Sequence, residues 1–153
     1  MLYVLGSFIL AAAGVLLKGL LNLSLSDVFV VLAIPMMLVF KVLGNRPAFF
    51  VYVAMLAGFA GGISFLYGYV IIPIRYYYGI WGWGGVVGGV LASLLLPFQL
   101  IIFLSVAYFK GGAVVYIGDF FAGILFGFAG LLLYLSPFTG SIWARLFHKG
   151  RNQ

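Results

Sequence analysis

Long apolar runs separated by short turns occupy almost the whole of this chain, and they decide which folds are open to it. The runs cover residues 2–21, 28–42, 49–74, 84–109 and 113–135. A crossing of the hydrocarbon core takes about 20 apolar residues in a helix. Only 7% of the residues are charged, whereas soluble domains carry about 25%. The sequence therefore predicts an all-α, polytopic transmembrane helix bundle with about five crossings, in a range of roughly four to six.

The turns and the tail complete this organisation. The crossings use nearly all of the 153 residues, so residues 1–153 form a single integral membrane domain. Ser24 or Ser26 is expected to cap the second helix, and Pro97 interrupts the fourth run. Residues 141–153 have helical spacing of apolar side chains against a basic face, which predicts a short C-terminal amphipathic helix on the membrane surface.

The eight basic residues lie between the apolar runs, where they anchor helix ends to lipid headgroups rather than bind nucleic acid. With five crossings and the N-terminus outside, the inner side carries Lys18, Arg75, Arg145, Lys149 and Arg151, and the outer side carries Lys41, Arg46 and Lys110. This imbalance predicts a multi-pass membrane protein with a cytoplasmic C-terminus.

An aromatic segment follows the third run. Tyrosine and tryptophan gather at the headgroup layer, where one end of the ring is apolar and the other is wet. The expected interfacial anchors are Tyr76, Tyr77, Tyr78, Trp81 and Trp83, with Trp143, Arg145 and Lys149 in the tail.

Glycines four residues apart indicate how the helices pack. Burying leucine between helices gains little in lipid, so close contact through small residues matters more. The pairs are Gly58 with Gly62, Gly84 with Gly88, Gly85 with Gly89, and Gly123 with Gly127. Each pair lies on one helix face and is expected to pack within the bundle or against a protein partner or second copy.

The residue inventory excludes most catalytic and cofactor chemistry. The chain has no cysteine, no glutamate and one histidine, so we expect no metal site, no cofactor and no Ser-His-Asp triad. We therefore expect a protein that is not an enzyme.

Asp27 and Asp119 are the only acidic residues, and a carboxylate in hydrocarbon marks a functional site by default. Asp27 is expected to be a hydrated charge at a helix N-terminus, favoured by the helix dipole. Asp119 is expected to pair with Lys110 or Lys18, or else to contact a ligand, proton or ion.

Two short patterns resemble known families. Asp27 followed by Ile34-Pro35, together with Gly118-Asp119, resembles the intramembrane aspartyl peptidases that process prepilins. That resemblance implies a pair of catalytic carboxylates that share a proton. Five crossings, however, predict that the two aspartates lie on opposite halves of the membrane. Residues 27–44 and 47–62 resemble the vitamin-uptake substrate subunits and the rod-shape membrane proteins, in which an apolar helix and a tight turn precede a glycine-rich helix.

The first interpretation is a non-catalytic membrane subunit or scaffold of a larger assembly. The alternative is a small-solute or ion transport component in which Asp119, Gln99 and Arg75 are the polar contacts. A second alternative is the peptidase. A cavity that reaches Asp119 would favour transport, whereas adjacent carboxylates would favour the peptidase.

Overall fold

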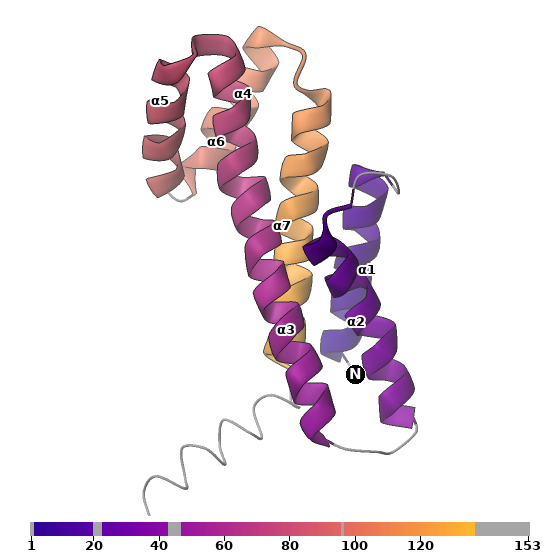
Figure 1. Ribbon diagram of the computed structural model, residues 1–153. Helices are drawn as coiled ribbons and strands as arrows, with labels where there is room; N and C mark the ends of the chain where they lie inside the picture. The colour runs from indigo at the N-terminus through magenta and orange to yellow at the C-terminus, as the bar shows by residue number, and fades with distance from the viewer. Residues whose placement is uncertain (1, 20–22, 43–46, 96, 137–153) are drawn as a thin grey trace, which may run out of the picture.

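The protein is an all-α bundle. The computed structural model describes residues 2–19, 23–42, 47–95 and 97–136, and within these ranges the chain forms six helices (Figure 1). They are α1 (Leu2–Lys18), α2 (Leu25–Val42), a continuous helix of α3 (Pro47–Leu66), η1 (Tyr67–Ile71) and α4 (Ile72–Trp81), then α5 (Trp83–Leu94), α6 (Phe98–Lys110) and α7 (Val114–Tyr134).

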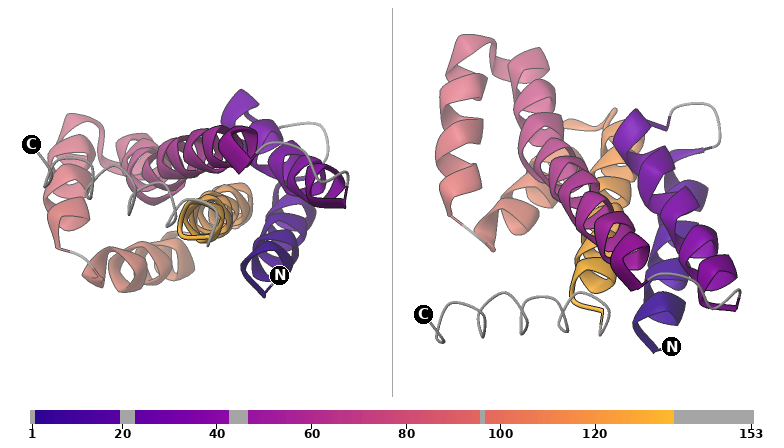
Figure 2. Two further views of the ribbon diagram at one scale, coloured as in Figure 1. Left: turned by 90° about the horizontal axis from the view of Figure 1, so that it is seen from below. Right: turned by 60° about the horizontal axis from the view of Figure 1, so that its bottom comes forward.

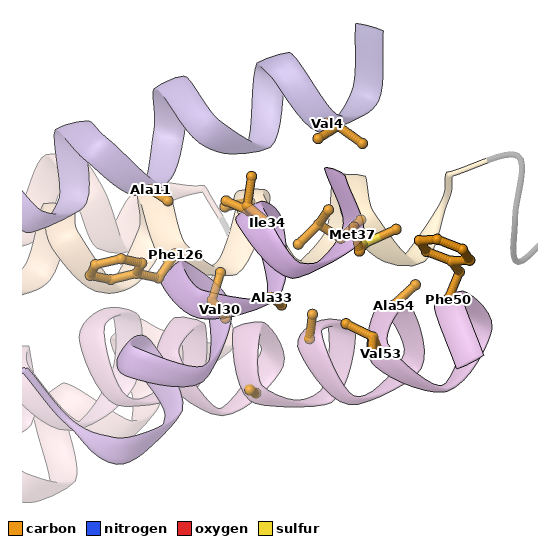
Figure 3. Close-up of a cluster of buried hydrophobic side chains, with 14 of the residues drawn as sticks. Val4, Ala11, Val30, Ala33, Ile34, Met37, Phe50, Val53, Ala54 and Phe126 are labelled. Carbon is orange, nitrogen blue, oxygen red and sulfur yellow. The ribbon is translucent and has the colours of Figure 1, made fainter. Parts of the chain in front are cut away.

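Helix α7 lies at the centre of the bundle. Seen from below, α3 and α4 run along one side of it, α1 and α2 lie at one end, and α5 and α6 lie at the other (Figure 2). Aliphatic and small residues of α1, α2 and α3 form one buried cluster with residues of α7, among them Phe126 (Figure 3). A second cluster joins η1 and α4 to α6 and α7 through aromatic side chains, among them Tyr76, Phe103 and Phe120.

Among the described residues, two helices are long and apolar enough to cross a membrane, Phe49–Trp81 with 33 residues and Val114–Tyr134 with 21. At 1.5 Å per residue the first is about 50 Å long, well beyond the ~30 Å hydrocarbon core. The remaining four helices are shorter. The structure therefore confirms a helical bundle with two helices of spanning length, and it does not show five crossings.

The run at 84–109 differs from the single helix that the sequence predicts. It forms two helices, α5 with 12 residues and α6 with 13, which fold back on each other beside α4 and α7 (Figure 1). Each is about 18–20 Å long, too short to cross the hydrocarbon core. Pro97 is the N-cap of α6, and a proline has no N–H to continue the hydrogen bonds of α5. The break therefore lies at the one residue in the run that cannot donate.

The aromatic segment also differs from expectation, because the third helix continues through it to Trp81. Tyr76 and Tyr77 are buried and pack against Phe103, at 5.7 and 6.3 Å between ring centroids. The Tyr76 hydroxyl donates a hydrogen bond to the Gly111 carbonyl at 2.9 Å. Tyr78, Trp81 and Trp83 are exposed, so an anchoring role at headgroups stays a prediction for these three. The tail helix, with Trp143, Arg145 and Lys149, lies outside the described residues.

Glycines bring α7 and the long helix into backbone contact. A Cβ at Gly123 would lie 2.6 Å from the Gly68 Cα, and one at Gly61 would lie 2.8 Å from the Gly130 Cα. Three further close positions are Gly58 against Tyr134, Gly127 against Phe65 and Gly89 against Ile74. Gly85 lies against the Tyr77 carbonyl, whereas Gly62, Gly84 and Gly88 have open space around them.

Candidate binding site

The Asp27 carboxylate is buried where α1, α2 and α3 meet, and it is the centre of a group of polar side chains. Asp27 lies in the first turn of α2 and is 1% exposed. Its Oδ2 accepts a hydrogen bond from Lys18 Nζ at 2.6 Å, and its Oδ1 accepts one from Ser64 Oγ at 2.5 Å. We call Lys18, Ser24, Asp27 and Ser64 the Asp27 cluster. It joins the end of α1, the start of α2 and the end of α3.

The start of α2 explains how Asp27 is held. Ser24 is the residue before the helix, and its Oγ accepts a hydrogen bond from the Asp27 N–H at 3.3 Å. The Asp27 carboxylate accepts one in return from the Ser24 N–H at 3.2 Å. This reciprocal arrangement is a capping box, with aspartate in the place of the usual glutamate. The prediction of a serine cap is confirmed at Ser24.

Lys18 reaches Asp27 because α1 ends there. Gly19 has φ of 71°, a conformation that glycine adopts freely and that terminates a helix. Lys18 is therefore in the last turn of α1, where its charge also complements the helix dipole. Its Nζ lies 5.8 Å from the centroid of the Tyr67 ring, close enough for a cation–π contact.

A polar cavity of about 470 Å³ opens beside this cluster. It is lined by Lys18, Leu23, Ser24, Ser26, Ile63, Tyr67, Arg75 and Asp119. These residues come from α1, the α1–α2 turn, α2, α3, η1, α4 and α7. Parts of the chain that are far apart in sequence thus contribute charged and hydroxyl groups to one space.

Asp119 and Arg75 line this cavity without a partner among the residues that the structure describes. No hydrogen bond or ion pair joins either side chain to that part of the chain, whereas the Lys18–Asp27 pair is closed at 2.6 Å. Asp119 is half-buried and Arg75 is exposed. One acid and one base thus remain available to a ligand in the cavity.

Close helix contacts hold Asp119 at this position. A Cβ at Gly118 would lie 3.1 Å from the Leu17 carbonyl oxygen, so glycine lets α7 approach the end of α1. On the other side, a Cβ at Gly68 would lie 3.3 Å from the Asp119 carbonyl oxygen. Asp119 is therefore fixed by backbone contacts with both α1 and η1.

The π-helical segment η1 begins at the cavity. Tyr67 is its first residue and lines the cavity, and Gly68 follows at the contact with α7. Segments of π-helix are rare and are frequent at functional sites, because they turn side chains out of the regular α-helical register. Here the segment separates Ser64, which bonds Asp27, from Arg75, which lines the far part of the cavity.

The positions of the two aspartates differ from the sequence-based expectation. Asp27 is buried rather than hydrated, and Lys18 pairs with it rather than with Asp119. Nor do the aspartates lie at opposite ends, since Lys18 and Ser24, which bond Asp27, line the same cavity as Asp119. The expectation failed because it counted residues 84–109 as a crossing, and the fold-back of α5 and α6 returns the chain to the side that it left.

Gln99 lies away from this cavity. It is fully buried on the face of α6 that also carries Phe103 and Ala107, and neither amide atom has a hydrogen-bond partner among the described residues. Sequence reasoning grouped Gln99 with Asp119 and Arg75, whereas only the last two line the cavity. The described residues contain no group of three histidine, cysteine or acidic side chains that could hold a metal ion.

The sequence analysis did not identify Ser64 and Tyr67 as residues of the candidate site. Ser64 is a lone hydroxyl in a glycine-rich apolar run, and Tyr67 precedes the recognised aromatic segment. Hydroxyl residues are common between packed membrane helices, so neither residue stands out by type. The sequence feature that could have indicated this site is Lys18, a basic residue at the end of an apolar run and nine residues before Asp27.

Comparison of the chain with protein families, curated proteins and solved structures finds no match. The site is therefore interpreted from its own geometry.

Proposed function

We propose that this protein is a transport component in the membrane that binds a small solute carrying one charge of each sign. The observation that carries the proposal is the polar cavity lined by Asp119 and Arg75. A solute with an anionic and a cationic group matches both side chains, because Arg75 binds carboxylate or phosphate oxygens and Asp119 accepts from an ammonium group.

The Lys18–Asp27 pair has a different part in this proposal. Its two charges already neutralise each other at 2.6 Å, so the pair adds no net charge to the cavity. A ligand that carried only a negative or only a positive charge would leave Asp119 or Arg75 uncompensated. Burying such an unpaired charge is costly, and a solute with both charges avoids the cost.

Membrane insertion is supported by the two helices of spanning length and by the apolar surface. Large apolar side chains are exposed on all seven α-helical segments, for example Leu5, Leu32, Leu56, Tyr78, Leu91, Ile101 and Leu131. We propose a multi-pass arrangement in which α1, α2, the α3–α4 helix and α7 cross, while α5 and α6 enter and return.

This arrangement keeps the C-terminus on the cytoplasmic side and moves the N-terminus there too. Lys41, Arg46 and the basic tail then share one side, and Arg75 and Lys110 lie toward the other. The larger share of basic residues is thus cytoplasmic, as the positive-inside rule requires.

Glycerophosphoethanolamine, whose phosphodiester and amine carry one charge of each sign, is a suitable probe of the cavity. Binding to the full chain in lipid nanodiscs is measured by calorimetry. We expect Arg75→Gln and Asp119→Asn each to weaken binding about tenfold or more, the loss expected for a hydrogen bond between charged groups. Arg75→Lys keeps part of the affinity, and Lys110→Gln, an exposed base outside the cavity, leaves it unchanged. Equal affinity in all four variants would overturn the proposal.

A second candidate is a non-catalytic subunit or scaffold that contacts a protein partner or a second copy. It is favoured by the open space around Gly84 and Gly88 on α5, which leaves a smooth helix face available to another helix. Mass measurement of the protein purified in mild detergent tests this candidate. A clean monomer that Gly88→Leu does not alter would count against it.

An aspartyl peptidase is a third candidate, supported by the approach of both aspartates to one cavity. The bonds from Lys18 and Ser64 to Asp27 oppose it, because a pair that activates water needs both carboxylates to share a proton. We therefore retain the interpretation that the protein is not an enzyme.

A further inference from the structure

An apolar groove continues directly from the polar cavity. It has a volume of about 510 Å³ and runs between α2 and α3, lined by Ser24, Leu25, Ser26, Phe29, Leu56, Phe59, Ala60 and Ile63. Ser24, Ser26 and Ile63 also line the polar cavity. Each space lies within the ~300–1,000 Å³ typical of small-molecule sites. The two spaces therefore meet at a boundary where the lining changes from polar to apolar.

The boundary itself carries hydroxyl groups. Ser26 Oγ lies 2.8 Å from Ser24 Oγ and 3.1 Å from Ser64 Oγ. Beyond them the groove has almost only hydrocarbon, with Phe29, Leu56 and Phe59 exposed toward it. A molecule that filled both spaces would have a charged end, a short hydrogen-bonding middle and an apolar chain.

We propose that the ligand of this site is an amphiphile, a membrane lipid with a phosphate-and-amine headgroup and a hydrocarbon chain. The headgroup occupies the polar cavity, with its phosphate at Arg75 and its amine at Asp119, and one chain lies in the groove between α2 and α3. This inference rests on the proposed function, since the same two side chains bind the headgroup. It adds the chain, and with it a class of substrate that enters from the bilayer.

Charge complementarity selects this headgroup. The Lys18–Asp27 pair is neutral, and Asp119 and Arg75 contribute one charge of each sign without a partner among the described residues. An anionic lipid without an amine would satisfy Arg75 and leave Asp119 facing its phosphate. The glycerol and ester oxygens of the lipid fall at the boundary. The Ser24 and Ser26 hydroxyls use one of their two protons in the bond between them and can donate the other to the lipid.

The experiment compares a lysolipid with its bare headgroup. Binding of tetradecanoyl lysophosphatidylethanolamine and of glycerophosphoethanolamine to the full chain is measured by native mass spectrometry in detergent. Leu56→Trp fills part of the groove, and Leu56 does not line the polar cavity. Met55→Trp is the control on the same helix, since Met55 is 40% exposed against 54% for Leu56 and lines neither space.

We expect Leu56→Trp to weaken lysolipid binding more than about tenfold and to leave glycerophosphoethanolamine binding unchanged, which also shows that the variant is folded. Met55→Trp leaves both unchanged. Lysophosphatidylglycerol, which has the chain but no amine, binds more weakly than the ethanolamine lipid to the wild type.

Other outcomes separate the two proposals. If both probes bind equally and Leu56→Trp affects neither, the groove does not bind the hydrocarbon chain, and the inference fails while the proposed function stands. If the glycerol lipid binds as well as the ethanolamine lipid, the headgroup assignment fails. If Arg75→Gln and Asp119→Asn change no probe's binding, the proposed function fails and the inference fails with it.

Discussion

The two carboxylates at the polar site, Asp27 and Asp119, differ in burial and in hydrogen bonding. Asp27 is 1% exposed and bonded to Lys18, Ser64 and the Ser24 backbone, whereas Asp119 is half-buried beside the cavity and has no bond to the described part of the chain. Both lie on apolar helices of the same bundle. The difference shows that a carboxylate inside such a bundle serves structure when its oxygens are occupied and is available to a ligand when they face a cavity.

The surroundings of each residue account for this difference. Asp27 lies where α1, α2 and α3 converge, so Lys18 of α1, the Ser24 N–H just before α2 and Ser64 of α3 supply donors to it. Asp119 is approached by backbone instead, at Gly118 beside Leu17 and at Gly68 in η1. Glycine brings helices close but offers no side-chain donor. Close packing thus fixes Asp119 in place without neutralising it.

The substitution Asp27→Asn tests whether Asp27 is structural, and it is expected to have the largest effect on stability. The substitution leaves Lys18, whose side chain is 7% exposed, without its counter-charge. Breaking a buried ion pair costs about 3–5 kcal/mol, and we expect the lower end because Lys18 borders a cavity. The free energy of unfolding, measured by thermal denaturation in detergent micelles, should fall by about 3 kcal/mol.

The double variant Lys18→Met with Asp27→Asn is the control, since it removes both charges together. It should recover most of the stability lost in Asp27→Asn. A single variant as stable as the wild type would show that Asp27 is not structural, and the distinction between the two acids would fall.

The second prediction concerns the contact of α7 with α3 and η1, which supports both Asp27 and Asp119. A Cβ at Gly123 would lie 2.6 Å from the Ser64 carbonyl oxygen and 2.6 Å from the Gly68 Cα. Gly123→Ala therefore pushes α7 away from Ser64, the donor to Asp27, and from η1, which supports Asp119. Overpacking of this kind costs about 1–3 kcal/mol, measured by the same denaturation assay.

Gly62→Ala is its matched control. Gly62 lies on the partner helix α3, and a Cβ there would meet nothing within 4 Å. The change should leave stability equal or raise it by up to about 1 kcal/mol, because alanine is the better helix former. Equal losses from both alanines would mean that the crossing is looser than its glycines imply.

Much of the fold follows from the pattern of apolar runs. The runs at 28–42 and 113–135 closely match α2 and α7, and the Gly111-Gly112 turn has φ of 70° and 69° as a tight turn requires. The fold-back at Pro97 could not be predicted in the same way. A run of the length of 84–109 suits one crossing as well as two short helices. The choice between them depends on tertiary packing, in which Phe103 of α6 contacts Tyr76 of α4.

The candidate site follows from the sequence only in part. Asp119 was singled out because a charge in an apolar run is costly. Arg75, which lies between two runs, was named beside it as a polar contact of the transport alternative. Their meeting in one cavity depends on where the chain reverses, which rests on the α5–α6 fold-back. The Lys18–Asp27 pair was missed because it spans a turn whose shape depends on Gly19 and on the Ser24 cap. Local rules predicted the cap, whereas the ion pair needs three helices in place.

The smallest expected effect is that of Asp119→Asn on stability. It distinguishes most clearly between a structural carboxylate and one that binds a ligand. With no bond to the described residues to lose, the substitution should change the free energy of unfolding by less than about 0.5 kcal/mol. In the same assay, glycerophosphoethanolamine should stabilise the wild type and not the variant, because a ligand raises stability only through the state that binds it. A loss near that of Asp27→Asn would make Asp119 a second structural acid. Unchanged stability together with lost stabilisation by the probe would assign one carboxylate to the fold and the other to the ligand.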